Sequence, residues 1–110
     1  MTLLQQMASE RMKHREFLRA ETRRELQAAL MENPPAASVI VFGSLLKPGR
    51  FNEASDVDLA LEGEPAGMSV YQLASVLAER LGRPVDVVLL PECRFRDRIV
   101  REGETWTLPG

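Results

Sequence analysis

Cysteine, histidine, tryptophan and tyrosine each occur once in this chain of 110 residues, the first two as Cys93 and His14. A single cysteine excludes a disulfide within the chain, and a single histidine leaves too few ligands for a zinc cluster. We assign no role to Cys93 and expect His14 to be solvated. Among the few aromatic residues, we expect Trp106, Tyr71 and Phe95 to be packing residues and not stacking partners for a nucleotide.

A long apolar segment is also missing, because no run approaches the length of a membrane-spanning helix. Near the N-terminus, Leu3 and Leu4 are followed by Glu10, Arg11 and Lys13 before any apolar stretch long enough for a signal sequence. We therefore expect the chain to have no membrane partner and to stay in the cytoplasm, where an isolated cysteine remains reduced.

The chain has no large excess of charge of either sign, since its formal net charge is -2. It exerts no general attraction on nucleic acids or membranes, and we expect no nucleic-acid partner. Its content of 45% hydrophobic and 27% charged residues is typical of a soluble globular protein. We interpret residues 1–110 as a single domain that is too small to enclose a large substrate.

Proline and glycine are absent from Thr2 to about Glu32, a segment rich in good helix formers, so we predict one long helix. The second half of this helix offers an apolar stripe to a core, formed by Phe17, Leu18, Leu26, Ala29 and Leu30. Residues 8–16 offer only Ala8 and Met12. We therefore interpret residues 1–16 as a helical extension that faces a partner protein.

Arginines recur every four residues along this helix, at Arg11, Arg15, Arg19 and Arg23. The spacing places them along one ridge, and interspersed glutamates cancel much of their charge. We predict a solvated helix face. The alternative is a ridge that binds a partner or nucleic acid.

Three short apolar segments predict strands. The first is "SVIVF" at residues 38–42, which follows a helix stop at "NPPAAS". One helical turn and a loop come after it, because Pro48 and Gly49 exclude a longer helix. The second strand is "DVDLALEG". The third is "PVDVVLLP" at residues 84–91, for which we expect a central, covered position because it is apolar on both faces.

Between the second and third strands, Ser69 and Gln72 form a capping box for a helix that ends at Gly82. A helix of this length is suited to a crossover between parallel strands. A short last helix ends at Gly103, and residues 104–110 are either an edge strand or a tail. The predicted fold class is α/β (α+β), in the order α-β-α-β-α-β, with a small mixed sheet covered by helices.

Two aspartates, Asp56 and Asp58, occupy the beginning of the second strand and point to the same face. Side-by-side carboxylates at the mouth of an apolar strand are unfavourable unless a cation lies between them. Asp86 is the one polar residue of the third strand, and parallel pairing would bring it beside the first two. Because hard divalent cations such as Mg²⁺ prefer carboxylate oxygens, we predict that these three aspartates bind metal.

Gly43 and Ser44 arrive at the same place if the first strand runs antiparallel to the second. Gly43 lets the backbone approach a ligand closely, and Ser44 opens a helical turn whose N–H groups and hydroxyl suit a phosphate. Phosphate, carboxylates and magnesium together indicate phosphoryl or nucleotidyl transfer. The sequence has no Walker A, G-x-G-x-x-G, EF-hand or hydrolase nucleophile pattern.

The string G-S, eleven residues, then D-V-D in an apolar strand, with a third aspartate after the next helix, resembles the DNA polymerase beta-like nucleotidyltransferase superfamily. In length the chain is similar to the minimal nucleotidyltransferase (MNT) family, and the resemblance covers about residues 17–103. It implies that Gly43 and Ser44 bind the triphosphate of ATP and that Asp56 and Asp58 ligate two Mg²⁺ ions. Asp86 would ligate the catalytic ion and orient or deprotonate the attacking hydroxyl.

The chain departs from the family pattern after the G-S pair. Many members carry a basic residue there, where this chain has Leu45 and Leu46. The nearest cations are Lys47 and Arg50, which either contact a phosphate or are solvated loop residues.

Members of the MNT family resemble antitoxins encoded beside a HEPN-type ribonuclease toxin, and some transfer AMP from ATP to a toxin tyrosine. The resemblance therefore implies a metal-dependent nucleotidyltransferase that modifies a hydroxyl of a HEPN-type partner, within a hetero-oligomer. The alternative is an inactive binding module that neutralises its partner by complex formation. Transfer to a small molecule such as an aminoglycoside is a third option, which the lack of an added acceptor domain disfavours.

Overall fold

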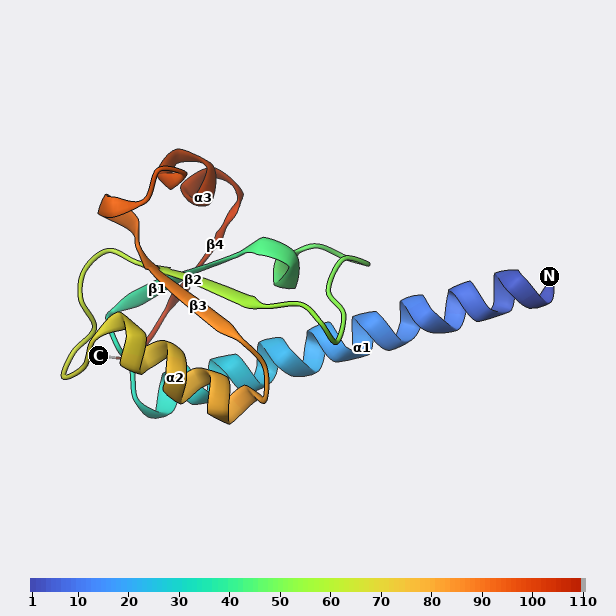
Figure 1. Cartoon of the computed structure of the whole chain (residues 1–110), viewed down its shortest axis with the longest axis horizontal. Helices are drawn as coiled ribbons and strands as arrows, with labels where there is room; N and C mark the ends of the chain where they lie inside the picture. The colour runs from blue at the N-terminus through green and yellow to red at the C-terminus, as the bar shows by residue number, and fades with distance from the viewer. Residues whose placement is uncertain (110) are drawn as a thin grey trace.

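A four-stranded mixed sheet with helices on both faces forms the centre of the computed structural model, which describes residues 1–109 (Figure 1). The elements in chain order are α1 (Leu3–Glu32), β1 (Ser38–Phe42), the 3₁₀ turn η1 (Gly43–Leu46), β2 (Val57–Leu61), α2 (Val70–Leu81), β3 (Val85–Leu89), the 3₁₀ turn η2 (Leu90–Glu92), α3 (Arg96–Glu102) and β4 (Glu104–Thr107). The predicted fold class is confirmed. The predicted order α-β-α-β-α-β corresponds to the segment from α1 to β3, with η1 in place of the second helix, and α3 and β4 follow it.

The strands lie in the order β3-β2-β1-β4. β1 runs antiparallel to β2 and β4, whereas β2 runs parallel to β3, with α2 as the crossover. Of the two interpretations of residues 104–110, the edge strand is confirmed for Glu104–Thr107. The next residue continues the contact, since the Leu108 N–H donates to the Ala37 carbonyl at 2.8 Å.

The position of β3 corrects the sequence prediction, because this strand lies at an edge of the sheet and not at its centre. Within residues 1–109 its one strand neighbour is β2. Val85, Val87 and Leu89 pack with the core under α1 and α2, whereas Val88 packs on the opposite face with Ile99 of α3. An apolar pattern on both faces of a strand therefore indicates that other elements cover both faces, and it does not indicate how many strands lie beside it.

The helix α2 is defined by local signals that the sequence already shows. The Ser69 hydroxyl accepts from the Gln72 N–H at 3.1 Å, and the Gln72 side chain accepts from the Ser69 N–H at 2.9 Å. Gly82 ends the helix in the left-handed region, at φ +70°. Leu73 and Leu77 are buried against the sheet, so the predicted capping box and amphipathic face are both confirmed.

The second half of α1 anchors this helix to the core through Leu26 and Leu30, which are fully buried. Phe17 corrects the predicted apolar stripe, because its side chain is 65% exposed. It precedes Leu26 by nine positions, which is about two and a half helical turns and places it on the opposite side of the helix. Leu18, one residue later, does pack against the core.

The N-terminal part of α1 extends beyond the sheet (Figure 1), and its residues 7–15 lie along the loop of residues 52–54. Residues 1–14 are exposed apart from the half-buried Ser9. For residues 8–16 the scarcity of apolar residues predicted this exposure, although Arg15 and Glu16 are also half-buried. His14 is exposed but lies 3.1 Å from a carboxylate oxygen of Glu53, so it is paired and not merely solvated. None of the helices within residues 1–109 is both long and apolar enough to cross a bilayer.

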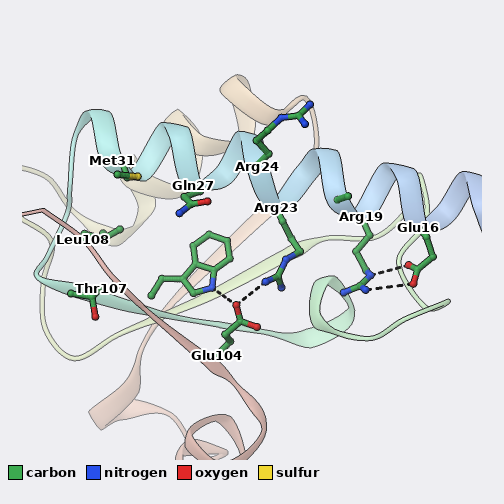
Figure 2. A pocket seen from close by; sticks show the side chains of 11 residues that line it. Glu16, Arg19, Arg23, Arg24, Gln27, Met31, Glu104, Thr107 and Leu108 are labelled. Atoms are coloured by element: carbon green, nitrogen blue, oxygen red, sulfur yellow. Dashed lines mark hydrogen bonds and ion pairs between the residues drawn. The ribbon is translucent and has the colours of Figure 1, made fainter.

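The arginine ridge of α1 faces the body of the molecule, so the predicted solvated face is wrong for three of its four members. Arg15, Arg19 and Arg23 are half-buried, and only Arg11 is exposed. Arg23 donates to Glu104 of β4 at 2.7 Å and lies over the Trp106 ring, 5.5 Å from its centroid (Figure 2). This pair joins α1 to the edge strand.

A cavity of about 630 Å³ lies between α1 and β4 along this ridge (Figure 2). Its three arginines are each paired with a glutamate, Arg19 with Glu16, Arg23 with Glu104, and Arg24 with Glu21. The charges are thus compensated within the chain, and the cavity is separate from the predicted aspartate site.

Candidate active site

Parallel pairing of β2 and β3 brings two of the three predicted aspartates side by side. Asp58 and Asp86 are register partners, and Asp58 is also opposite Phe42, the last residue of β1. All three positions lie on the sheet face that carries α3, because Phe42 and the neighbouring Ala60 and Val88 pack in the cluster around Ile99. The end of β1 and the starts of β2 and β3 therefore meet on one open face.

Gly43 follows Phe42 directly and has a conformation that favours glycine, with φ +81°. A Cβ added at this position would collide with the Asp58 carboxylate. The missing side chain therefore leaves space for the carboxylate and for any ligand that it binds. Ser44 is half-buried in η1, and its carbonyl accepts from the Lys47 N–H at 3.0 Å.

The pKa of Asp58 reflects its burial and the two carboxylates nearby. Burial, followed by the charges of Asp86 and Asp56, raises the pKa of Asp58 from 3.8 to about 6. All three causes disfavour the ionised form in the absence of a cation. A divalent cation would reverse the effect, because it attracts all of these carboxylates.

A pocket of about 480 Å³ opens over these residues between the sheet and α3. It brings together Gly43, Lys47, Asp58 and Asp86 from the predicted site. Its remaining lining residues are Phe42, Leu46, Val87, Val88, Cys93, Phe95, Arg98, Ile99 and Glu102. The lining of the pocket thus combines apolar side chains with a few charged ones, as is usual for sites that bind small molecules.

Three predicted residues lie outside the pocket lining. Asp56 is exposed immediately before β2, although its charge acts on Asp58. Ser44 is adjacent to the pocket through Gly43, and Arg50 is exposed in the loop beyond it. Of the two cations considered for the phosphates, Lys47 is therefore the one that reaches the pocket.

Comparison with known proteins identifies the fold. The family "Polymerase beta, Nucleotidyltransferase" matches residues 24–106, which is most of the chain. The chain belongs to this family. One chain of a crystal structure of a toxin-antitoxin with AMP-PNP superposes with a TM-score of 0.59 at 26% sequence identity, covering 76% of this chain and 72% of that chain. No curated protein matches the sequence.

These matches confirm the predicted polymerase beta-like nucleotidyltransferase fold and support assignment to its minimal, antitoxin type. Within the match to this nucleotidyltransferase family lie all seven residues predicted for the site: Gly43, Ser44, Lys47, Arg50, Asp56, Asp58 and Asp86.

The donor set of this nucleotidyltransferase fits Mg²⁺. Within residues 1–109, the His, Cys, Asp and Glu side chains form no group of three that is placed to hold a metal ion by itself. Mg²⁺ is usually held by one or two carboxylates together with substrate phosphates. The neighbouring carboxylates of Asp58 and Asp86, and the space that Gly43 leaves beside them, fit an ion bound jointly with a nucleotide.

The sequence analysis missed four residues that α3 and the preceding turn bring to this site, namely Cys93, Phe95, Arg98 and Glu102. The expectation that Phe95 and Tyr71 are packing residues is wrong, because Phe95 is 64% exposed at the pocket and Tyr71 is 82% exposed on α2. Arg98 donates to Glu102 at 3.1 Å on the same helix. Their spacing of four residues was visible in the sequence, but the docking of α3 onto the aspartate face was not.

Arg83 supports the loop that leads into Asp56. Its guanidinium donates to the carbonyl of Ser55 at 2.9 Å and to that of Asn52 at 3.1 Å, and it lies 4.5 Å from the centroid of the Phe51 ring. Phe51 is fully buried. Arg83, which lies two residues before β3, thus holds the segment that leads into Asp56, the first aspartate of the family motif.

Proposed function

We propose that this chain is an active nucleotidyltransferase that transfers AMP from ATP to a hydroxyl group of a partner protein, with Mg²⁺ as cofactor. The observation that carries the proposal is the in-register pair of Asp58 and Asp86 beside Gly43. This arrangement concentrates negative charge at one point, and the raised pKa of Asp58 shows that its ionised form is disfavoured there, so a bound cation would stabilise it. The similarity to a toxin-antitoxin chain whose crystal structure contains AMP-PNP supports the choice of ATP.

The reaction requires the acceptor oxygen to bond to the α-phosphorus of ATP while the bond to the pyrophosphate oxygen breaks. In our proposal Asp86 orients the acceptor hydroxyl and takes its proton. Asp56 and Asp58, with Asp86, would hold two Mg²⁺ ions, which neutralise charge on the phosphates and on the leaving pyrophosphate. Catalysis is then mainly a matter of positioning and charge compensation.

The triphosphate would lie against the turn that starts at Gly43 and Ser44, because the first N–H groups of a helical turn have no partner within the turn. Lys47 lines the same pocket and supplies positive charge. Arg98 is the second cation of the pocket lining, and it would have to leave Glu102 to bind a phosphate. Arg50 is assigned to solvent or to the outer part of the triphosphate.

The partner in this proposal is a HEPN-type toxin, and the chain acts as its antitoxin in the cytoplasm. The pocket lies between the sheet and α3, and in this proposal the partner protein presents the acceptor hydroxyl to it. The N-terminal part of α1, which extends beyond the body, offers exposed Leu3, Leu4 and Met7 to such a partner.

The competing proposal is a binding module that neutralises the partner by contact alone. An intact-mass measurement of the protein encoded by the neighbouring gene, after incubation with this chain, ATP and Mg²⁺, separates the two. The wild type should add one or more AMP units and Asp58→Asn none. Asp97→Asn is the matched control, because Asp97 is exposed on α3 and does not line the pocket.

A complex that forms with both the wild type and Asp58→Asn, without any gain of mass, would refute transfer to that partner. It would leave the binding module as the explanation.

A further inference from the structure

The loop that carries the glycine-serine turn is attached to the side of α1. The Arg19 guanidinium donates to the carbonyl of Leu45, inside η1, at 3.1 Å. Four residues earlier on the helix, Arg15 donates to the carbonyl of Gly49 at 3.4 Å. Two successive members of the arginine ridge thus bind the backbone of residues 43–50 at both ends of the loop.

Glu16 completes this contact. It accepts from Arg19 at 2.9 Å, through Nε, and at 3.4 Å, through Nη2 (Figure 2). The hydrogen bond from Arg19 is the main cause of a lowered pKa for Glu16, and the Gly49 backbone N–H contributes in the same direction. We call Arg15, Glu16 and Arg19 the α1 clasp, because the two arginines hold the carbonyls of Gly49 and Leu45 and Glu16 holds Arg19.

The clasp connects the core-anchored helix α1 to the loop of residues 43–50. Further along α1, Leu26 and Leu30 are fully buried in the core. Arg19 is itself shielded, with a side chain that is 21% exposed, and hydrogen bonds from a charged group are stronger than neutral ones. The Leu45 side chain is fully buried in the core, so η1 is held both by this side chain and by the hydrogen bond from Arg19 to the Leu45 carbonyl.

We infer that Arg19, assisted by Arg15 and Glu16, is a positioning residue for the triphosphate-binding turn. It lines the cavity along the arginine ridge, and it is absent from the lining of the aspartate pocket. Its role is to hold the η1 backbone, and with it Gly43, Ser44 and Lys47, in the geometry that receives the phosphates. This inference rests on the proposed function and adds a residue that the family motif does not include.

The test compares Arg19→Gln with Arg24→Gln in the full-length chain. Arg24 is a matched control, because it lies on the same helix and pairs with a glutamate three residues before it, but its side chain is 70% exposed and does not contact the loop. Binding of Mg²⁺ with AMP-PNP is measured by calorimetry, and KM and kcat for AMP transfer are measured on the partner protein.

We expect Arg19→Gln to weaken nucleotide binding and raise KM for ATP by roughly 10-fold, from the loss of charge-assisted hydrogen bonds, while kcat changes little. Arg24→Gln should match the wild type. Arg19→Lys keeps the charge but lacks the planar fork that reaches Glu16 and Leu45 together, so it should be intermediate. Amide hydrogen exchange should accelerate within residues 43–50 in Arg19→Gln and stay unchanged in α2.

Several outcomes would overturn the inference. If the wild type binds nucleotide and Arg19→Gln binds it equally well, the clasp has no positioning role. A fall in kcat with KM unchanged would also contradict it. If Arg19→Gln unfolds, Arg15→Gln decides, since it removes only the Gly49 contact and should raise KM by about 3-fold. Nucleotide binding by the wild type without AMP transfer would refute the proposed function and leave the clasp in place.

Discussion

Asp58→Asn should increase the stability of the metal-free protein at alkaline pH, although it abolishes the proposed activity. The wild-type carboxyl has a pKa of about 6 in the folded chain and 3.8 as its ordinary value. Between these values the folded state binds more protons than the unfolded state, so stability falls as pH rises through this window and levels off above it. At pH 8 the charged carboxylate therefore opposes folding.

The size of the expected change in the free energy of unfolding follows from the raised pKa of Asp58. About two pKa units correspond to about 3 kcal/mol, but Asp58 is only half-buried, and solvent screening reduces this to about 1–2 kcal/mol. Asparagine has the same shape without the charge, so it should recover that amount at pH 8 and almost nothing at pH 4, where the carboxyl is mostly protonated. Burial is the largest cause of the raised pKa, and it penalises the charge of Asp58 whatever the shape of the side chain.

The assay is urea unfolding in EDTA at pH 4 and pH 8 for the wild type, Asp58→Asn and Glu64→Gln, the last an exposed loop carboxylate used as the control. The difference between Asp58→Asn and the wild type should appear at pH 8 and vanish at pH 4. Added Mg²⁺ with AMP-PNP should stabilise the wild type and not the variant. A variant that is less stable than the wild type at pH 8 would refute the reasoning.

Three further changes test separate parts of the structure. Gly43→Ala forces a side chain into a left-handed conformation and into the Asp58 carboxylate, so it should lose about 1–3 kcal/mol and all nucleotide binding, measured by urea unfolding and calorimetry. Arg83→Met removes the donor to the Asn52 and Ser55 carbonyls, and hydrogen exchange should accelerate in residues 52–56 while α1 is unaffected. Ser69→Ala removes the N-cap of α2 and should cost about 1 kcal/mol without changing KM for ATP.

Local signals explain why most elements were predictable from the sequence. The capping box at Ser69 and Gln72, the glycine after α2, and the stop after α1 each depend on residues within one turn of each other. The site followed from the same kind of reasoning, because parallel pairing across an α crossover fixes which ends of strands meet. The sequence alone therefore predicts that Asp58 and Asp86 lie together, as they do in the paired strands β2 and β3.

The errors share a different cause, which is that they depend on how one element docks on another. The prediction of a solvated arginine ridge was wrong because Arg15 and Arg19 donate to backbone carbonyls, and a pattern of side chains in the sequence does not reveal such partners. Phe95 was misplaced because the spacing within α3 does not reveal which face of the sheet it covers. Likewise, the apolar pattern of β3 could not distinguish an edge strand from a central one.

The charge balance of the pocket favours an acceptor that comes from a partner protein. Asp58, Asp86 and Glu102 face Lys47 and Arg98, and the Arg98–Glu102 pair is already compensated. One lysine therefore remains against two aspartates, so nucleotide binding must depend on the cations that arrive with the phosphates. The only cover over this face within the described chain is the seven-residue α3 and the short turn before it. A free small acceptor would find few groups to orient it, whereas a partner docked on the surface could hold its own hydroxyl at the α-phosphorus, as the proposed AMP transfer requires.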